Sequence, residues 1–314
     1  MKKVIGLAVM MSLATGLLAQ ENKNAPGGGQ EQLPLETRRI VVRTDLVNVL
    51  FTVTDKKNRM VLNLSKDDVK VFEDNKPQVI ENFSRESDLP LRIAILIDTS
   101  NSVRDRLRFE QESAIDFLSS TIRPNKDQAF IVSFDNEPQL LQDYTDNLEK
   151  LSAAIRSLQA GGGTGLYEAI YFSAKDKMIF FPPPEPYLRR VMIVVSDGED
   201  NLSARTREEA LAMAQRGEVT IFAISTNRSG TARPGDKVLK RLAEETGGQA
   251  FFPFAASDLA GDFREIAREL RSQYSLAYVS SNKAQDGTFR NITLLPRGKE
   301  YRVRAKNGYF APSQ

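Results

Sequence analysis

Histidine and cysteine are both absent from this chain of 314 residues. Without histidine a Ser-His-Asp nucleophile system cannot be assembled, and without cysteine there is no thiol nucleophile. Zinc sites built on imidazole or thiolate ligands are excluded for the same reason. Disulfides are impossible as well, so cysteine usage does not report the redox compartment. Any ion binding must therefore rest on oxygen ligands.

The chain also lacks a strong excess of charge of either sign. Lysine and arginine number 43, against 41 aspartates and glutamates. Two of the basic residues, Lys2 and Lys3, lie in a segment that is predicted to be removed, and the rest of the chain is formally neutral. A neutral chain creates no field that attracts nucleic acid or an anionic membrane, so neither is expected as a partner.

The N-terminal segment has the pattern of a secretory signal peptide, predicted over residues 1–19. Met1-Lys-Lys is a basic start, Val4 to Leu18 is a short apolar run, and Ala19 is a small residue at a plausible cleavage point. The alternative of a retained anchor is disfavoured, because the apolar run is shorter than the ~20 residues that a membrane span needs. With no cysteine there is no lipoprotein attachment site. We therefore expect a secreted or periplasmic protein with no membrane span after signal cleavage.

Three further segments have distinct compositions. Residues 20–38 are polar and rich in Gly and Pro, and they are expected to form a flexible linker because they cannot bury enough apolar surface to order themselves. The next segment, 39–88, and the last one, 273–312, have β-strand composition and pattern. Because three strands alone are marginally stable, we expect both ends to join in one small β-sandwich. The predicted strands lie at 40–42, 46–53, 69–73, 79–83, 274–279, 289–295 and 301–305, and 69–73 and 79–83 are expected to form a hairpin around 74–77.

Between these β segments, residues 89–272 alternate between strand and helix patterns. Such alternation is typical of a doubly wound, mostly parallel sheet covered by helices on both faces. Thr206-Arg-Glu-Glu209 has the spacing of a helix capping box. The run from Pro138 to Gln142 follows the preceding strand too closely for a crossover, so an antiparallel edge strand is expected there. The predicted parallel strands are 91–97, 129–134, 189–196, 219–225 and 249–253.

Oxygen-bearing side chains lie where two of the buried strands end. Asp98, Ser100 and Ser102 follow the apolar run 91–97, and Asp197 follows 191–196. Thr164 lies in Gly161-Gly-Gly-Thr-Gly165, at the mouth of a helix. The carboxyl ends of neighbouring parallel strands meet at one edge of a sheet, where ligands bind. Carboxylate and hydroxyl oxygens suit hard divalent cations, so the sequence predicts a site for Mg²⁺, or for Mn²⁺ or Ca²⁺.

Each of these residues also has a purely structural interpretation. Asp98 and Thr164 could cap helices, and Asp197 could serve a turn. The glycine-rich segment could form a phosphate loop, but it lacks the Lys-Ser/Thr that follows a Walker loop, so no nucleotide is expected. Asp135, Glu199 and Asp200 are expected to form a solvated acidic rim near the same edge. The metal interpretation rests on the five residues acting together.

The set Asp98, Ser100, Ser102, Thr164 and Asp197 resembles the metal-ion-dependent adhesion site of von Willebrand factor type A domains. The family pattern is Asp-x-Ser-x-Ser, a distant Thr and a distant Asp, and all five positions match. The resemblance covers roughly residues 89–272. The order of the β and α/β segments, with the C-terminal run 301–310, is similar to a bacterial VWFA-related family best known from acidobacteria.

The resemblance implies a binding module that is not an enzyme. In this family the metal ligates an acidic oxygen of the partner, so a protein ligand with an exposed Asp or Glu is expected. In related domains the last helix can shift and couple metal ligation to affinity, and 256–272 is the corresponding segment here. The alternative is a metal-dependent hydrolase or enzyme subunit that uses the ion as a Lewis acid, with Glu199, Asp135 or a lysine as acid or base.

Overall fold

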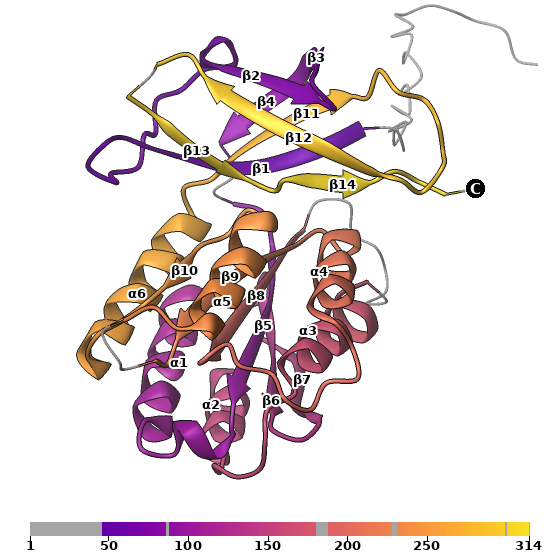
Figure 1. Ribbon diagram of the computed structural model, residues 1–314. Coiled ribbons are helices and arrows are strands. Elements are labelled where there is room, and N and C mark those ends of the chain that lie inside the picture. Colours follow the sequence, from indigo (N-terminus) through magenta and orange to yellow (C-terminus); the bar gives the residue numbers. More distant parts are fainter. Residues whose placement is uncertain (1–45, 86–87, 180–187, 228–230, 299, 314) are drawn as a thin grey trace, which may run out of the picture. The chain divides into compact units, whose positions relative to one another are not determined.

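The structure is a computed structural model that describes residues 46–85, 88–179, 188–227, 231–298 and 300–313. The predicted signal peptide, the linker and the strand at 40–42 lie outside the described residues. The helices and strands fall into an α/β part and a β part (Figure 1). In the part of the chain that the structure describes, no helix combines the length and the apolar character needed to cross a membrane.

A six-stranded sheet forms the centre of the α/β part. Five of its strands are parallel, and the edge strand β7 is antiparallel to β6. Successive side chains of a strand point to opposite faces of the sheet, and the central strand β5 is buried along its whole length and apolar except at Arg92 and Asp98. The order across the sheet is β10 (Ala250–Phe251), β9 (Val219–Ser225), β8 (Arg189–Ser196), β5 (Leu91–Asp98), β6 (Gln128–Phe134) and β7 (Pro138–Thr145). The predicted doubly wound α/β fold is confirmed.

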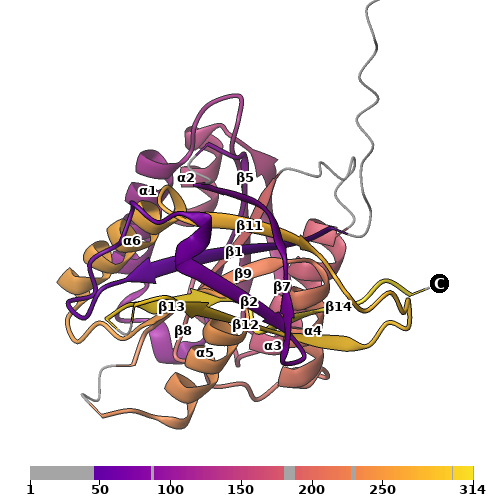
Figure 2. The same cartoon turned by 90° about the horizontal axis from the view of Figure 1, so that it is seen from above.

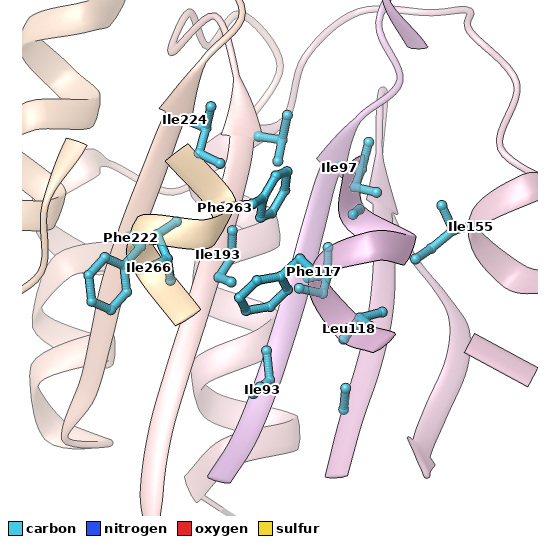
Figure 3. Packing of buried hydrophobic residues seen from close by; sticks show 14 of the residues in the cluster. Ile93, Ile97, Phe117, Leu118, Ile155, Ile193, Phe222, Ile224, Phe263 and Ile266 are labelled. Carbon is cyan, nitrogen blue, oxygen red and sulfur yellow. The ribbon is translucent and has the colours of Figure 1, made fainter. Parts of the chain in front are cut away.

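Helices cover both faces of this sheet. On one face, Ile93, Ile95 and Ile97 of β5 share a cluster with α1 (Leu107–Thr121), α2 (Leu148–Arg156) and α6 (Ala256–Leu270). Phe117 of α1 and Phe263 of α6 lie on this face (Figure 3). Their ring centroids are 5.3 Å apart. On the other face, Ala94 and Leu96 pack with α3 (Leu166–Phe172), its π-helical continuation η3 (Ser173–Ile179), α4 (Arg207–Arg216) and α5 (Pro234–Glu245). Thr206 caps α4 in the predicted capping box.

The β part combines strands from both ends of the chain in two four-stranded sheets (Figures 1 and 2). Side chains from both sheets belong to one apolar cluster that includes Val49, Phe51, Val71, Tyr274 and Ile292. A short 3-10 helix, η1 (Lys66–Asp68), precedes β2. One sheet has the order β13 (Arg302–Ala305), β1 (Leu46–Thr54), β11 (Tyr274–Val279) and β4 (Ile80–Arg85); the other has β14 (Gly308–Phe310), β12 (Phe289–Pro296), β2 (Val69–Glu73) and β3 (Lys76–Gln78). The boundaries of the domains as independent units stay a prediction.

The predicted hairpin between 69–73 and 79–83 is wrong in its second strand. Asp74 and Asn75 both have positive φ, at 46° and 64°, which makes a tight two-residue turn. The return strand therefore begins at once, and β3 pairs with β2. After β3 the chain crosses to the other sheet, where β4 pairs with β11.

Asp127, just before β6, lies at the amino-terminal edge of the sheet, opposite the edge at which β5 ends with Asp98. Its carboxylate accepts hydrogen bonds from Leu91 N at 2.8 Å, from Arg123 Nε at 2.7 Å and from an Arg271 guanidinium nitrogen at 2.9 Å. Burial opposes ionisation of this carboxyl, but the hydrogen bonds outweigh it and lower its pKa to about 2. The start of β5 and the ends of α1 and α6 are thereby held to one buried charge.

Candidate metal centre

The candidate site lies at the carboxyl edge of the six-stranded sheet, where β5 and β8 end side by side. Ile97 is paired with Val195 in the parallel ladder; Asp98 is the last residue of β5, and Asp197 directly follows the end of the neighbouring β8. Asp98 is fully buried, whereas Asp197 is partly exposed. The structure thus brings the two predicted carboxylates to the same edge.

Asp98 is a buried carboxylate held by neutral donors. It accepts hydrogen bonds from the backbone N–H of Ser100 at 2.9 Å and from the hydroxyl of Ser196 at 2.7 Å. Burial raises its pKa to about 6 against these hydrogen bonds, and the charge of Asp197 raises it further. Within the described residues neither carboxylate forms an ion pair with a lysine or arginine. Two neighbouring acids therefore share a site in which, among the described residues, no lysine or arginine pairs with either of them.

Two serine hydroxyls connect the strand ends. Ser102, in the short 3-10 helix η2 (Asn101–Val103), donates to Asp197 Oδ2 at 3.0 Å, and its hydroxyl lies 2.9 Å from that of Ser100. Ser100 is buried and Ser102 is exposed. Four of the five predicted residues are therefore joined in one network of direct hydrogen bonds.

Thr164 reaches the same edge through its loop rather than through a hydrogen bond of its own hydroxyl to the other four. Gly161 N donates to Thr99 O at 2.7 Å, which fixes this loop against the loop after β5. Thr164 N donates to Asn201 Oδ1 at 3.0 Å, and Asn201 N donates back to Thr164 O at 3.0 Å. Thr164 is only 4% exposed and is thus held between the loops that carry Asp98 and Asp197.

Two glycines permit this close approach of loops. Gly162 has φ +79°, and a Cβ there would lie 3.0 Å from Asn136 Oδ1. Gly235, at the start of α5, packs so tightly against the loop after β8 that a Cβ would lie 2.2 Å from Asp197 O. Glycine is required at Gly162 because the backbone is left-handed there, and at Gly235 because the backbone of another loop leaves no room for a Cβ.

The hydrogen bonds show which of the structural roles these residues have in the fold. Gly165, not Thr164, is the N-cap of α3. The Asp98 carboxylate accepts a hydrogen bond from Ser100 N in the turn that follows β5, and not from the first residues of α1. Asp197 Oδ1 does accept from Glu199 N at 3.0 Å, so this carboxylate serves a turn as well as the network.

Sequence reasoning missed the residues that hold the site loops. Asp200, expected in a solvated rim, instead accepts from Tyr167 N at 2.8 Å and from the Ser203 hydroxyl at 2.6 Å, and so anchors the first turn of α3. Asn136 accepts from Gly163 N at 2.9 Å. Asparagine and aspartate in turn-rich segments indicate that their side chains bond to nearby backbone groups. Sequence spacing does not identify Gly163 and Tyr167 as partners, because they lie 27 and 33 positions away along the chain.

The donor set fits a hard divalent cation. It consists of two carboxylates and three hydroxyls, all of them oxygen ligands. In the described part of the chain no group of three or more His, Cys, Asp or Glu side chains is clustered as a metal site. A cation at this edge would therefore depend on the hydroxyls of Ser100, Ser102 and Thr164 as well as on Asp98 and Asp197.

Comparison with known proteins gives a consistent assignment. Residues 93–199 match the family model of the von Willebrand factor type A domain. The human von Willebrand factor A domain-containing protein 3B is 27% identical over 172 residues, which cover 53% of this chain and 12% of the human protein.

Solved structures share the fold at low sequence identity. The vWF domain of the type V pilus tip protein Mfa5 from Porphyromonas gingivalis has a TM-score of 0.51 at 17% identity, covering 63% of this chain and 99% of that one. Proximal thread matrix protein 1 from the mussel byssus has a TM-score of 0.52 at 17% identity, covering 63% and 50%. The finer resemblance to the bacterial VWFA-related family stays a prediction. Residues 93–199 thus match the von Willebrand factor type A domain family, and solved domains of that type share the fold of this part of the chain.

Proposed function

We propose that this chain is a divalent-metal-dependent protein-binding module that captures an acidic residue of its partner at the carboxyl edge of the sheet. The observation that carries the proposal is the junction of Asp98 and Asp197: the backbone N–H of Ser100 donates to Asp98, and the hydroxyls of Ser100 and Ser102 continue the network to Asp197. This junction concentrates negative charge and oxygen ligands at one point, where no described lysine or arginine forms an ion pair with either carboxylate.

Some residues of the site would hold the ion, and others would leave it accessible to a partner. Asp98 and Asp197 would neutralise its two charges, and the hydroxyls of Ser100, Ser102 and Thr164 would add neutral ligands. Asp98 is buried beneath the site, whereas Ser102 is exposed, so the site opens towards solvent on the Ser102 side. A bound cation would supply an open coordination position for an anionic oxygen, such as a partner Asp or Glu.

The known proteins support this choice of function over others. The mussel byssus protein is described with zinc in its metal-ion-dependent adhesion site, and the Porphyromonas domain belongs to a pilus tip protein. Both are matrix or surface-appendage proteins, which agrees with a binding role outside the cytoplasm. The N-terminal pattern of residues 1–19 predicts the same secreted or periplasmic compartment. Magnesium is the proposed ion, with Mn²⁺ and Ca²⁺ as alternatives.

The experiment that tests the proposal separates metal from partner. Mg²⁺ is titrated calorimetrically into each variant, followed by a short peptide with a single Asp, and a peptide with Asn in its place serves as control. Thr164→Ala removes a neutral ligand, so it should keep the ion while weakening the Asp peptide several-fold. Asp197→Ala removes one of two neutralising charges and should lose both. Peptide binding that survives EDTA, or that does not distinguish Asp from Asn, would refute metal-bridged recognition.

A further inference from the structure

A cavity of about 510 Å³ opens at the carboxyl ends of β9 and β10, next to the candidate metal centre. Its lining includes Ser225 at the end of β9, Lys237 and Lys240 of α5, and Phe252 and Phe254 of the segment between β10 and α6. Gly235, one residue before the cavity-lining Asp236, contacts the backbone of Asp197 directly. The cavity and the metal centre are therefore separated by a single loop.

The cavity presents apolar surface to solvent. Phe252 is 49% exposed and Phe254 is 75% exposed, and both are among the most exposed large apolar side chains of the described residues. Ala232 and Pro253 add further apolar surface to the lining. Aromatic side chains beside a cavity of this size suit the anchoring of an apolar side chain from a partner.

The rim of the cavity is basic. Lys237 and Lys240 are both exposed on α5. Lys240 lies 3.7 Å from Glu244, with both side chains more than half exposed, so this ion pair contributes little. Lys237 has no ion pair to another described residue. Asp236 is buried, and its carboxylate accepts from Ser225 at 2.6 Å and from Asn227 at 2.7 Å, so it faces its own loop.

The sheet geometry sets the spacing between the two sites. The metal centre lies across the ends of β5 and β8, and the cavity lies across the ends of β9 and β10, in the order β10-β9-β8-β5. Neighbouring strands are ~4.8 Å apart, so the two sites are separated by two strand spacings, or ~10 Å. An extended peptide advances ~3.3 Å per residue, and about three residues bridge this distance.

We propose that the cavity is a second recognition site for the same partner segment, and this rests on the proposed function. The partner segment is an extended acidic peptide in which an apolar side chain, Phe or Leu, follows or precedes the metal-ligating Asp or Glu by about three residues. The apolar side chain enters the cavity against Phe252 and Phe254. A flanking acidic residue pairs with Lys237 and Lys240, which gives charge complementarity as well as apolar burial.

The test uses fluorescein-labelled peptides and the full chain in Mg²⁺, with fluorescence anisotropy as readout. The probes are Asp-Gly-Ser-Phe-Glu and its reverse, Glu-Phe-Ser-Gly-Asp, and the spacing control is Gly-Ser-Asp-Phe-Glu. Phe254→Ala and the double variant Lys237→Glu/Lys240→Glu should each weaken the better-spaced probe by ~10-fold, in the range of interface anchor residues. Leu295→Ala, at a site that is 48% exposed on β12, and Lys150→Glu on α2 are the matched controls and should change affinity less than twofold.

The outcomes separate this inference from the proposed function. Binding that is lost in EDTA but unchanged in Phe254→Ala and in the lysine double variant leaves metal-bridged recognition standing and overturns the second site. Binding that persists in EDTA but falls in Phe254→Ala supports the cavity as a peptide site and overturns the metal bridge. If Phe254→Ala instead changes the sedimentation coefficient of the chain alone and leaves peptide affinity unaltered, the occupant is a second copy of this chain and the inference is wrong.

Discussion

Replacement of Asp127 by Asn removes the charge that organises one edge of the sheet. The Asp127 side chain is 0% exposed and lies 2.7 Å from Arg123 and 2.9 Å from Arg271. Its pKa is lowered to about 2, from the ordinary value of 3.8. At 1.36 kcal/mol per pKa unit, this shift corresponds to about 2–3 kcal/mol of folding free energy at neutral pH.

The pH dependence follows from the sign of the shift. Because the pKa is depressed in the folded state, the contribution is fully present above pH 3.8 and is lost as the pH falls towards 2. Asp127→Asn should therefore lower the free energy of unfolding by about 2–3 kcal/mol at pH 7, and by about half as much at pH 3.

Urea unfolding at several pH values measures both quantities. Glu112→Gln is the matched control, because Glu112 pairs with Arg108 while both side chains are more than half exposed, and it should change stability by less than ~0.5 kcal/mol. A cost for Asp127→Asn that stays constant from pH 7 to pH 3, or that is as small as the control, would refute the electrostatic account of this edge.

Two further predictions concern the site itself. In metal-free protein, Asp98→Asn should raise the free energy of unfolding at pH 7 by about 1–3 kcal/mol. The reason is that burial raises the pKa of this carboxyl to about 6, so its charge destabilises the folded state at pH 7. Urea unfolding in EDTA measures the change, and a loss of stability would contradict the prediction. Gly235→Ala should cost about 1–3 kcal/mol, since its Cβ would lie 2.2 Å from Asp197 O, whereas Gly161→Ala, which meets nothing within 4 Å, should be nearly neutral; equal melting temperatures for the two variants would contradict the packing argument.

The α/β fold was predictable because its signals are local and strong. Strand β5, which contains the predicted run 91–97, is buried at all eight positions, and the predicted strand at 189–196 has the same bounds as β8. Thr206 and Glu209 form the capping box that their spacing predicts. The two carboxylates meet as predicted, because parallel strands place their carboxyl ends at one edge.

The support of the site was not predictable, because it depends on contacts between distant segments. Asn201 holds Thr164 across 37 positions of sequence, and Asn136 holds Gly163 across 27. The crossing from β3 to β4 was missed for a different reason: 79–83 has strand composition, but composition does not state which sheet a strand joins. The shape and basic rim of the cavity beside α5 likewise arise from segments that meet only in the folded chain.

The central claim is that Asp98, Ser100, Ser102, Thr164 and Asp197 hold a divalent cation, and metal-linked thermal unfolding tests it most directly. With Mg²⁺ at one hundred times its dissociation constant, the chain should gain about 2.7 kcal/mol of stability over the protein in EDTA. Asp98→Ala should abolish this gain, whereas Asp105→Ala, which removes an exposed acid nearby in sequence, should keep it. Superimposable melting curves in Mg²⁺ and EDTA, or an equal gain in Asp98→Ala, would contradict the metal centre.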